Sequence, residues 1–532
     1  MFHKGDSRFL RESPLSQQRI TPQNLRRSKQ RKGVTMKSKL SDHKLKKGKF
    51  ITPINSIPLM QELSDEKSWT YGRMPEYVWI GLILHTLGRN EGLNKLYKII
   101  LELHKLAPDL STARLSQILK LESDIQKKFY NFIIGEIGRE VLAPLTVIAT
   151  ESDNPEFCEA FFMVDLSIEE RCDALTDTMK KIMGHQTHES TDIRFVALYY
   201  YLLKGRMHLP KQQIELITSY PRLSHGAEEM RMVRPSVRSL EMMMLNFEEP
   251  DSIYIQKFWR RISEMTECTL YTLEFPIEKR DIDEYMEKLH KIFEYLSELY
   301  VAVSPFEDKM NVLLGIATYS YKRLKEAYEH NLFNSISGRN CVRGLIENYM
   351  MMKYLVKNEA NHENIWKDYK LYGLGSYKLV LAKHREFGAE GEPHFDQGYI
   401  EAIVNEFKEE EFINMDTGYF NKQGIREKFD SVDEKLLYGL YYDYDSSFEH
   451  GLWGAIRESS LLKCNNPAHQ YHCIPDIDDI IVLKSVMPDC VMVMNKTLSF
   501  LDELYSLPKA LFEEVIGFEI KSFNGEDDAN TN

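Results

Sequence analysis

The sequence predicts an all-α protein, with a multi-helical N-terminal domain followed by a C-terminal helical bundle. Apolar residues recur every three or four positions over long stretches, which is the spacing of one face of an α-helix. Strand-like alternation is convincing nowhere, and only Thr269–Phe275 is considered as a strand. Helix-start signals agree with the periodicity, because Pro75 suits a first helical turn and Asp281 suits an N-cap.

The first strong helical signal covers residues 77–106, with a break expected at Gly88. Further helices are expected over residues 124–145, 168–184, 192–203, 211–220, 281–303, 312–329, 341–357 and 477–505. Runs rich in helix breakers lie near residues 246–251 and 274–277. They divide the chain into an N-terminal helical domain (51–250), a connecting segment (251–280) and a C-terminal bundle (281–520).

The two ends of the chain differ in charge from its body. Residues 1–50 contain 15 Lys or Arg and 3 Asp or Glu, a net charge of +12, whereas the whole chain carries −12. We expect this basic segment to be a disordered, solvated tail, and residues 521–532 to be a disordered acidic tail. Met36 is an alternative translation start. The remaining body is acidic, which argues against a broad nucleic-acid-binding face.

Composition indicates a cytoplasmic protein. No run approaches 18 consecutive apolar residues, so no membrane span is expected. The first residues contain no apolar core of a secretory signal. Seven cysteines, an odd number without a framework spacing, fit a reducing compartment: Cys158, Cys172, Cys268, Cys341, Cys464, Cys473 and Cys490.

The helix expected at 341–357 carries a charged stripe among apolar residues. Arg343 and Glu347 are four residues apart and therefore share a face. Charged groups on such a helix must be paired or face a cavity. One interpretation is an ion pair that holds two helices in register. In the other, Arg343 binds an anion and Glu347 orients that arginine.

A second polar cluster lies at residues 444–451. Ser447 and His450 are three residues apart and share a face if a helix begins near Ser446. The positive end of that helix would then favour a bound phosphate. His450 is the best candidate for a general acid or base, and Arg457 would lie two turns further along the same face. The alternative is a capping serine beside a hydrogen-bonded histidine.

A third cluster combines two cysteines with two histidines: Cys464, His469, His472 and Cys473. Zinc sites usually take their ligands from two separated pairs, and the adjacent His472 and Cys473 rarely bind one ion. We therefore interpret the Asn-Asn-Pro stretch at 465–467 as a turn between helices. We expect no metal and no other cofactor. The chain also lacks a phosphate-binding glycine loop, a dinucleotide fingerprint and a nucleophile elbow.

Residues 281–505 resemble an uncharacterised family of bacterial all-helical proteins. The resemblance rests on Arg343 with Glu347, and on three further segments: Trp366 to Tyr369, Ser447 to Gly451, and Cys464 to His469. That family is distantly similar to HEPN-type helical domains of toxins and phage-defence proteins. The resemblance implies a metal-independent ribonuclease that pairs an arginine with a histidine, often across a homodimer. The arginine that this pattern places four to six residues before the histidine is missing ahead of His450.

Two hypotheses follow. In the first, the protein is a nuclease or another phosphate-directed enzyme acting on RNA or a nucleotide. His450 transfers the proton, Arg343 stabilises the anion, and Glu347 and Ser447 position them. In the second, the protein is a non-catalytic interaction or sensor protein. The same polar residues are then structural, and the N-terminal domain presents the surface for a protein partner.

Overall fold

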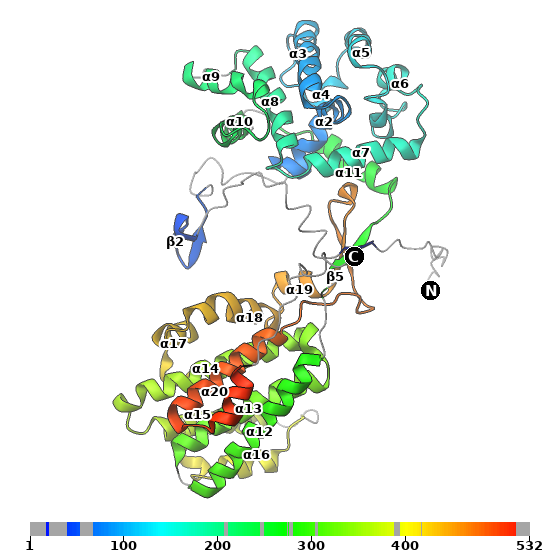
Figure 1. The fold of residues 1–532 in the computed structure, drawn as a ribbon. Coiled ribbons are helices and arrows are strands. Elements are labelled where there is room, and N and C mark those ends of the chain that lie inside the picture. Colours follow the sequence, from blue (N-terminus) through cyan, green and yellow to red (C-terminus); the bar gives the residue numbers. More distant parts are fainter. Residues whose placement is uncertain are drawn as a thin grey trace, which may run out of the picture. The chain divides into compact units, whose positions relative to one another are not determined.

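The structure is a computed structural model, and it describes residues 18–20, 40–53, 67–206, 211–244, 249–273, 275, 280–303, 307–387, 394–415 and 418–517. The described residues form helices almost throughout, which confirms the predicted all-α class (Figure 1). The chain divides into two compact units. Unit 1 comprises residues 1–271 and 462–474, and unit 2 comprises residues 272–461 and 475–532.

Unit 1 contains ten α-helices within its described residues. They are α2 (Met74–Leu87), α3 (Arg89–Leu106), α4 (Leu115–Ile118), α5 (Ser123–Ile137), α6 (Pro155–Phe161), α7 (Ile168–Ile182), α8 (His188–Leu203), α9 (Lys211–Ser219), α10 (Met230–Met244) and α11 (Ser252–Glu264). Short π or 3-10 turns connect some of them: η5 (Trp69–Arg73), η6 (Ala143–Val147) and η7 (Tyr220–Arg222). The break expected at Gly88 separates α2 from α3, and its positive φ of 76° suits glycine.

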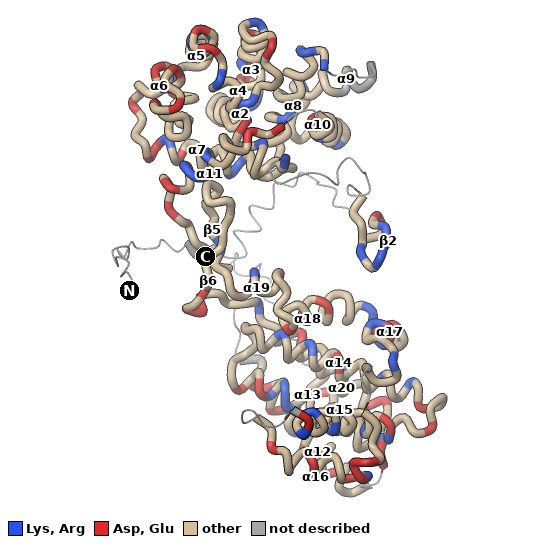
Figure 2. The backbone as a smooth tube through the Cα atoms, turned by 180° about the vertical axis from the view of Figure 1, so that it is seen from behind, with Lys and Arg blue, Asp and Glu red and all other residues tan. Residues whose placement is uncertain are grey.

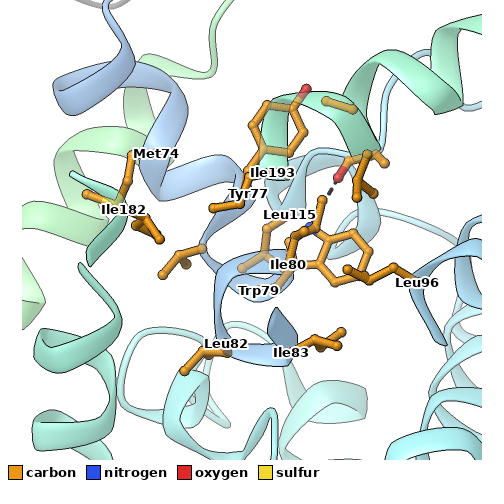
Figure 3. Close-up of a cluster of buried hydrophobic side chains, with 14 of the residues drawn as sticks. Met74, Tyr77, Trp79, Ile80, Leu82, Ile83, Leu96, Leu115, Ile182 and Ile193 are labelled. Atoms are coloured by element: carbon orange, nitrogen blue, oxygen red, sulfur yellow. Dashed lines mark hydrogen bonds between the residues drawn. The ribbon is translucent and has the colours of Figure 1, made fainter. Parts of the chain in front are cut away.

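Helix α2 is the centre of unit 1. Its residues from Met74 to Ile83 are all buried, so this part of the helix is surrounded by other elements. Figure 3 shows several of these side chains beside Leu96, Leu115, Ile182 and Ile193 of neighbouring helices. Ser68 caps η5, the turn that leads into α2, and its hydroxyl accepts a hydrogen bond from the Tyr71 amide. The indole of Trp79 donates to the carbonyl of Ala113 at 3.1 Å, which satisfies its buried N–H.

Unit 2 is built around α14 (Ile336–Asn358). It packs most extensively against three helices: α13 (Asp308–Glu329), α18 (Asp443–Glu449) and α20 (Met487–Tyr505). The unit also contains α12 (Arg280–Val303), α15 (Ile365–Phe387), α16 (Gln397–Val404), α17 (Ile425–Ser431), α19 (Trp453–Ser459) and α21 (Lys509–Ile516). Its short turns are η9 (Leu332–Asn334), η10 (Glu359–Asn361), η11 (Glu410–Phe412), η12 (Phe420–Lys422) and the π-helical η13 (Leu437–Tyr442).

Short strands complete the fold. A four-stranded sheet has the order β1-β4-β5-β6: β1 (Gln18–Ile20), β4 (Leu270–Leu273), β5 (Leu461–Cys464) and β6 (Cys473–Pro475). β4 and β5 are antiparallel, with Leu270 opposite Cys464. β4 corresponds to the strand considered at Thr269–Phe275. The 3-10 turn η6 and the turn η14 (Pro467–His469) also belong to unit 1.

The structure departs from the expected ranges in several places. The helix expected at 124–145 ends at Ile137, because Gly138 with its φ of 84° follows it. Residues 252–264, assigned above to the connecting segment, form α11, and its Phe258 lies in the core of unit 1. Residues 44–51, assigned mostly to the tail, form a hairpin of β2 (Lys44–Lys46) and β3 (Lys49–Ile51) after the 3-10 turn η1 (Leu40–Asp42). Residues 477–486, expected to be helical, precede α20 as irregular chain. Most of the remaining basic tail and the whole acidic tail lie outside the described residues.

Charges of both signs are interspersed along the helices of each unit (Figure 2). The β2–β3 hairpin is the most uniformly basic described segment, because Lys44, Lys46, Lys47 and Lys49 lie within it. Among the described residues, no helix combines the length and the apolar character that crossing a membrane requires.

Candidate functional site

Arg343 and Glu347 lie on one face of α14, as their spacing predicts. Their closest side-chain atoms, Nη2 and Oε2, are 3.7 Å apart. Arg343 also donates from Nε to the Ser446 hydroxyl at 3.2 Å and from Nη2 to the Tyr442 hydroxyl at 3.0 Å. Glu347 accepts a hydrogen bond from the Tyr419 hydroxyl at 3.0 Å. We call these five residues the α14 polar network.

The tyrosines of this network act as neutral hydrogen-bonding groups. Burial, together with the charge of Glu347, raises the pKa of both Tyr419 and Tyr442 above the ordinary value of 10.0. The guanidinium of Arg343 also lies 5.0 Å from the centre of the Tyr442 ring, a cation–π distance. Arg343 and Glu347 retain exposed side-chain fractions of 22% and 24%. The hydrogen bonds from Arg343 therefore connect α14 to both α18 and η13, and they engage its Nε and Nη2 atoms.

Ser447 and His450 have different surroundings from those predicted. Ser447 donates its hydroxyl to the carbonyl of Tyr444, one turn earlier in its own helix, at 2.6 Å. It is the neighbouring Ser446 that contacts Arg343. His450 is exposed at the C-terminal end of α18. The described contacts thus join Arg343 and Glu347 to each other but link neither of them to Ser447 or His450.

The expected phosphate site at a helix N-terminus is a second difference. The helix does not begin near Ser446, because η13 continues directly into α18 at Asp443. His450 therefore caps the negative end of α18, where a phosphate is disfavoured. Gly451, with a φ of 56°, ends the helix. Arg457 lies on the separate helix α19 and donates to the carbonyl of Leu461.

Two buried carboxyl groups lie beside the network and were not singled out from the sequence. Asp445 on α18 is 4% exposed, and burial raises its pKa from 3.8 to about 7. Burial also raises the pKa of Asp489 on α20. Both groups interact electrostatically with the buried Arg339. The sequence signal was present, since Asp445 precedes Phe448 by three residues and Phe448 is a core residue of the same face.

Unit 1 contains a large open groove between α6, α7 and α11. Its volume is about 1360 Å³. Its apolar lining is unusually exposed, with Ile253 at 81%, Met163 at 78% and Ile168 at 57%. Phe162 and Met265 extend the same surface at 48% and 40%. We call this surface the α6–α11 groove.

Charges of both signs border the groove, and α11 itself contributes Glu264, which pairs with Arg260 at 2.9 Å. Helix α11 contributes Lys257, Arg260 and Arg261, whereas Glu151 and Glu159 come from α6 and the loop before it. Lys257 and Arg261 both pair with Asp153, and the Arg261 contact measures 2.9 Å. Sequence reasoning missed the groove because its residues are distant along the chain and share no motif.

The cysteines and histidines considered for a metal are also rearranged by the fold. Cys464, His469 and His472 lie together, and their fourth neighbour is Cys268 at the end of the α11 segment. Any two of the four candidate ligand atoms are within 4.8 Å of each other. Cys473 is not a member of this group, and its sulfur faces the carbonyl of Tyr471. The spacing rule failed because one ligand comes from a segment almost 200 residues earlier.

Comparison with known proteins adds one relationship. Residues 311–469 match a family of unknown function, DUF5677. The matched segment contains Arg343, Glu347, Ser447 and His450, and it supports the expectation of an uncharacterised domain in the C-terminal part. No curated protein and no solved structure matches the chain.

Proposed function

We propose that the protein is a non-catalytic interaction protein whose unit 1 binds an amphipathic helix of a protein partner. The observation that carries this proposal is the α6–α11 groove with its exposed apolar lining. Ile253 and Met163 are both more than three-quarters exposed, although isoleucine and methionine are residues that folded proteins usually bury. Contiguous apolar surface of this kind marks interaction sites.

The size and the charges of the groove support a helix as its occupant. Small-molecule sites usually measure roughly 300–1,000 Å³, and this groove is larger at about 1360 Å³. Amphipathic helices place their apolar face in such grooves with anchors at three- and four-residue spacing. Charged residues on both sides of the apolar lining would form the polar rim that surrounds such an interface. The two methionines, Met163 and Met265, supply a lining that adapts to different side chains.

The α14 polar network supports the same proposal. Hydrogen bonds join Arg343 to Ser446 and Tyr442, and Glu347 to Tyr419, as expected of a structural contact between helices. Catalysis by the predicted mechanism would instead need Arg343, Ser447 and His450 around one phosphate. In this proposal the protein acts in the cytoplasm, where its cysteines stay reduced.

A phosphate-directed nuclease of the toxin or phage-defence kind is the second candidate function. Its specific support is the exposed imidazole of His450, on a helix that Arg343 contacts through Ser446. The distant likeness to HEPN-type domains, a homodimeric state and binding of RNA or a nucleotide belong to this alternative. It requires His450 to act with groups other than those it was predicted to join.

The interaction proposal is tested by selecting displayed helical peptides on the purified full chain. The selected peptides should carry apolar residues at helical spacing. They should bind at least tenfold more weakly, about 1.4 kcal/mol, when Ile253→Glu or Met163→Glu places a charge in the groove. Fluorescence polarisation measures the affinities. Both substituted side chains are largely exposed, so neither variant should lose more than about 0.5 kcal/mol of stability.

Met232→Glu is the matched control, because Met232 is 70% exposed on α10 of the same unit and does not line the groove. This variant should keep the affinity of the natural chain. Peptides that bind all three variants equally would overturn the proposal. A selection that enriches no helical apolar pattern would overturn it as well.

A further inference from the structure

We propose that Cys268, Cys464, His469 and His472 form a structural zinc site within unit 1. This inference is independent of the α6–α11 groove and of the function proposed for it. The four residues provide two sulfur and two nitrogen ligands, one of the ligand sets that tetrahedral zinc prefers. Cys464 is the last residue of β5, His469 and His472 lie between β5 and β6, and Cys268 comes from the segment after α11.

The distances between the ligand atoms agree with a single central ion. The sulfur of Cys268 lies 3.3 Å from Nδ1 of His469 and 3.2 Å from Nε2 of His472. The sulfur of Cys464 lies 3.6 Å from the same Nδ1 atom. Tetrahedral zinc, with bonds of about 2.3 Å to sulfur and about 2.0 Å to nitrogen, separates a sulfur from a nitrogen by about 3.5 Å.

The hydrogen bonds of His469 leave its Nδ1 atom available to bind a metal. Its Nε2 atom lies 3.1 Å from both the carbonyl oxygen and the hydroxyl of Thr266. The carbonyl can only accept, so Nε2 carries the proton and Nδ1 presents its lone pair toward the two sulfurs. A hydrogen bond from the second ring nitrogen to a backbone carbonyl is the usual support of a metal-bound histidine.

The loop around Cys464 is also shaped for a thiolate. The backbone amide of Asn466 donates to the Cys464 sulfur at 3.4 Å, which stabilises negative charge on that buried atom. The Asn466 side chain holds the loop, because it donates to the carbonyl of Glu267 and accepts from the amide of Ala468. Gln470 and Tyr471 both have a positive φ, near 53°, and this costly conformation places His469 and His472 on the same side.

The chemistry of the set favours zinc over other ions and a structural role over a catalytic one. Two thiolates and two imidazoles in tetrahedral positions suit zinc better than calcium or magnesium, which prefer oxygen. Four protein ligands leave no position for a reacting water, as in structural zinc sites. The ion would join two segments almost 200 residues apart in the chain and would stabilise their association in the folded state.

The test is the metal content of the purified full chain, produced with a tag that contains no histidine. Elemental mass spectrometry should find about one zinc ion per chain. Cys268→Ser and Cys464→Ser should each lose at least four-fifths of it, and a chelator should lower the melting temperature of the natural chain. Replacing zinc with cobalt(II) should give the absorption of a tetrahedral ion with thiolate ligands.

Cys473→Ser is the matched control, because Cys473 directly follows His472 but lies outside the ligand set. It should retain zinc and the response to chelator. Zinc retained by both Cys268→Ser and Cys464→Ser would overturn the proposal. The proposal would also be overturned if the chain, purified with a reducing agent, contained a Cys268–Cys464 disulfide and no metal. If Cys464→Ser fails to fold, the more exposed Cys268→Ser and the cobalt spectrum of the natural chain still decide the question.

Discussion

Replacing Asp445 with asparagine should change how the stability of unit 2 depends on pH. The pKa of Asp445 is about 7 in the folded protein, against 3.8 without the surrounding structure. The cause is burial, which removes the ionised carboxylate from water. A raised carboxyl pKa means that the folded state holds the proton more tightly. Stability therefore falls as pH rises from about 4 to about 7, and it is constant above that range.

The magnitude follows from these two pKa values. Between pH 5 and pH 8, ionisation of Asp445 should reduce the free energy of unfolding by about 2.5 kcal/mol. Asp445→Asn removes this titration, so the difference in stability between the two pH values should shrink by that amount. Asp445→Asn also leaves the buried Arg339 beside an uncharged amide, which changes the free energy of unfolding equally at both pH values. This effect cancels when the free energies at pH 5 and pH 8 are subtracted.

Urea unfolding followed by circular dichroism at pH 5 and pH 8 measures this effect. Asp443→Asn is the control, because it makes the same chemical change at an exposed position of the same helix. An unchanged pH dependence in Asp445→Asn would refute the reasoning that burial, rather than ion pairing with Arg339, dominates this carboxyl group.

Three further changes have defined outcomes. Glu241→Gln should lower the free energy of unfolding by about 3–5 kcal/mol, measured by urea unfolding, because Arg73 and Arg194 then stay buried without their only nearby carboxylate among the described residues. Gly338→Ala should lower the free energy of unfolding by about 1–3 kcal/mol, because a Cβ atom there would lie 2.4 Å from the Leu332 carbonyl oxygen. Gly439→Ala is the control and should be tolerated, because its Cβ atom would meet no atom within 4 Å. His450→Ala should leave both stability and any cleavage of labelled RNA unchanged; a loss of cleavage with an unchanged melting temperature would favour the nuclease.

The helical class and part of the candidate site could be predicted because both depend on local spacing. Helical periodicity is a property of neighbouring residues, and the Arg343–Glu347 pair follows from one turn of a single helix. The start of α18 could not be predicted in this way. Ser446 looks like a cap in isolation, but the apolar residues Leu437 and Tyr442 are buried and extend the helix upstream. Tertiary packing overrode the local capping preference.

Features that depend on distant segments were beyond local reasoning. The burial that shifts the pKa of Asp445 comes with the packing of α18 against α14, and the sequence around Asp445 gives only a polar residue near a phenylalanine. Cys268 is almost 200 residues from Cys464, so no spacing rule connects them. The same holds for the α6–α11 groove, where Met163 and Ile253 become neighbours only after the helices assemble.

The membership of residues 462–474 in unit 1 has a consequence for synthesis of the chain. Unit 1 otherwise ends at residue 271, so a ribosome must add about 200 more residues before the last part of this unit exists. At roughly 5–20 residues per second, this delay is about 10–40 s. During that interval Cys268 has left the ribosome without Cys464, His469 and His472. The nascent helices of unit 1 must therefore persist in an unfinished state while most of unit 2 is translated.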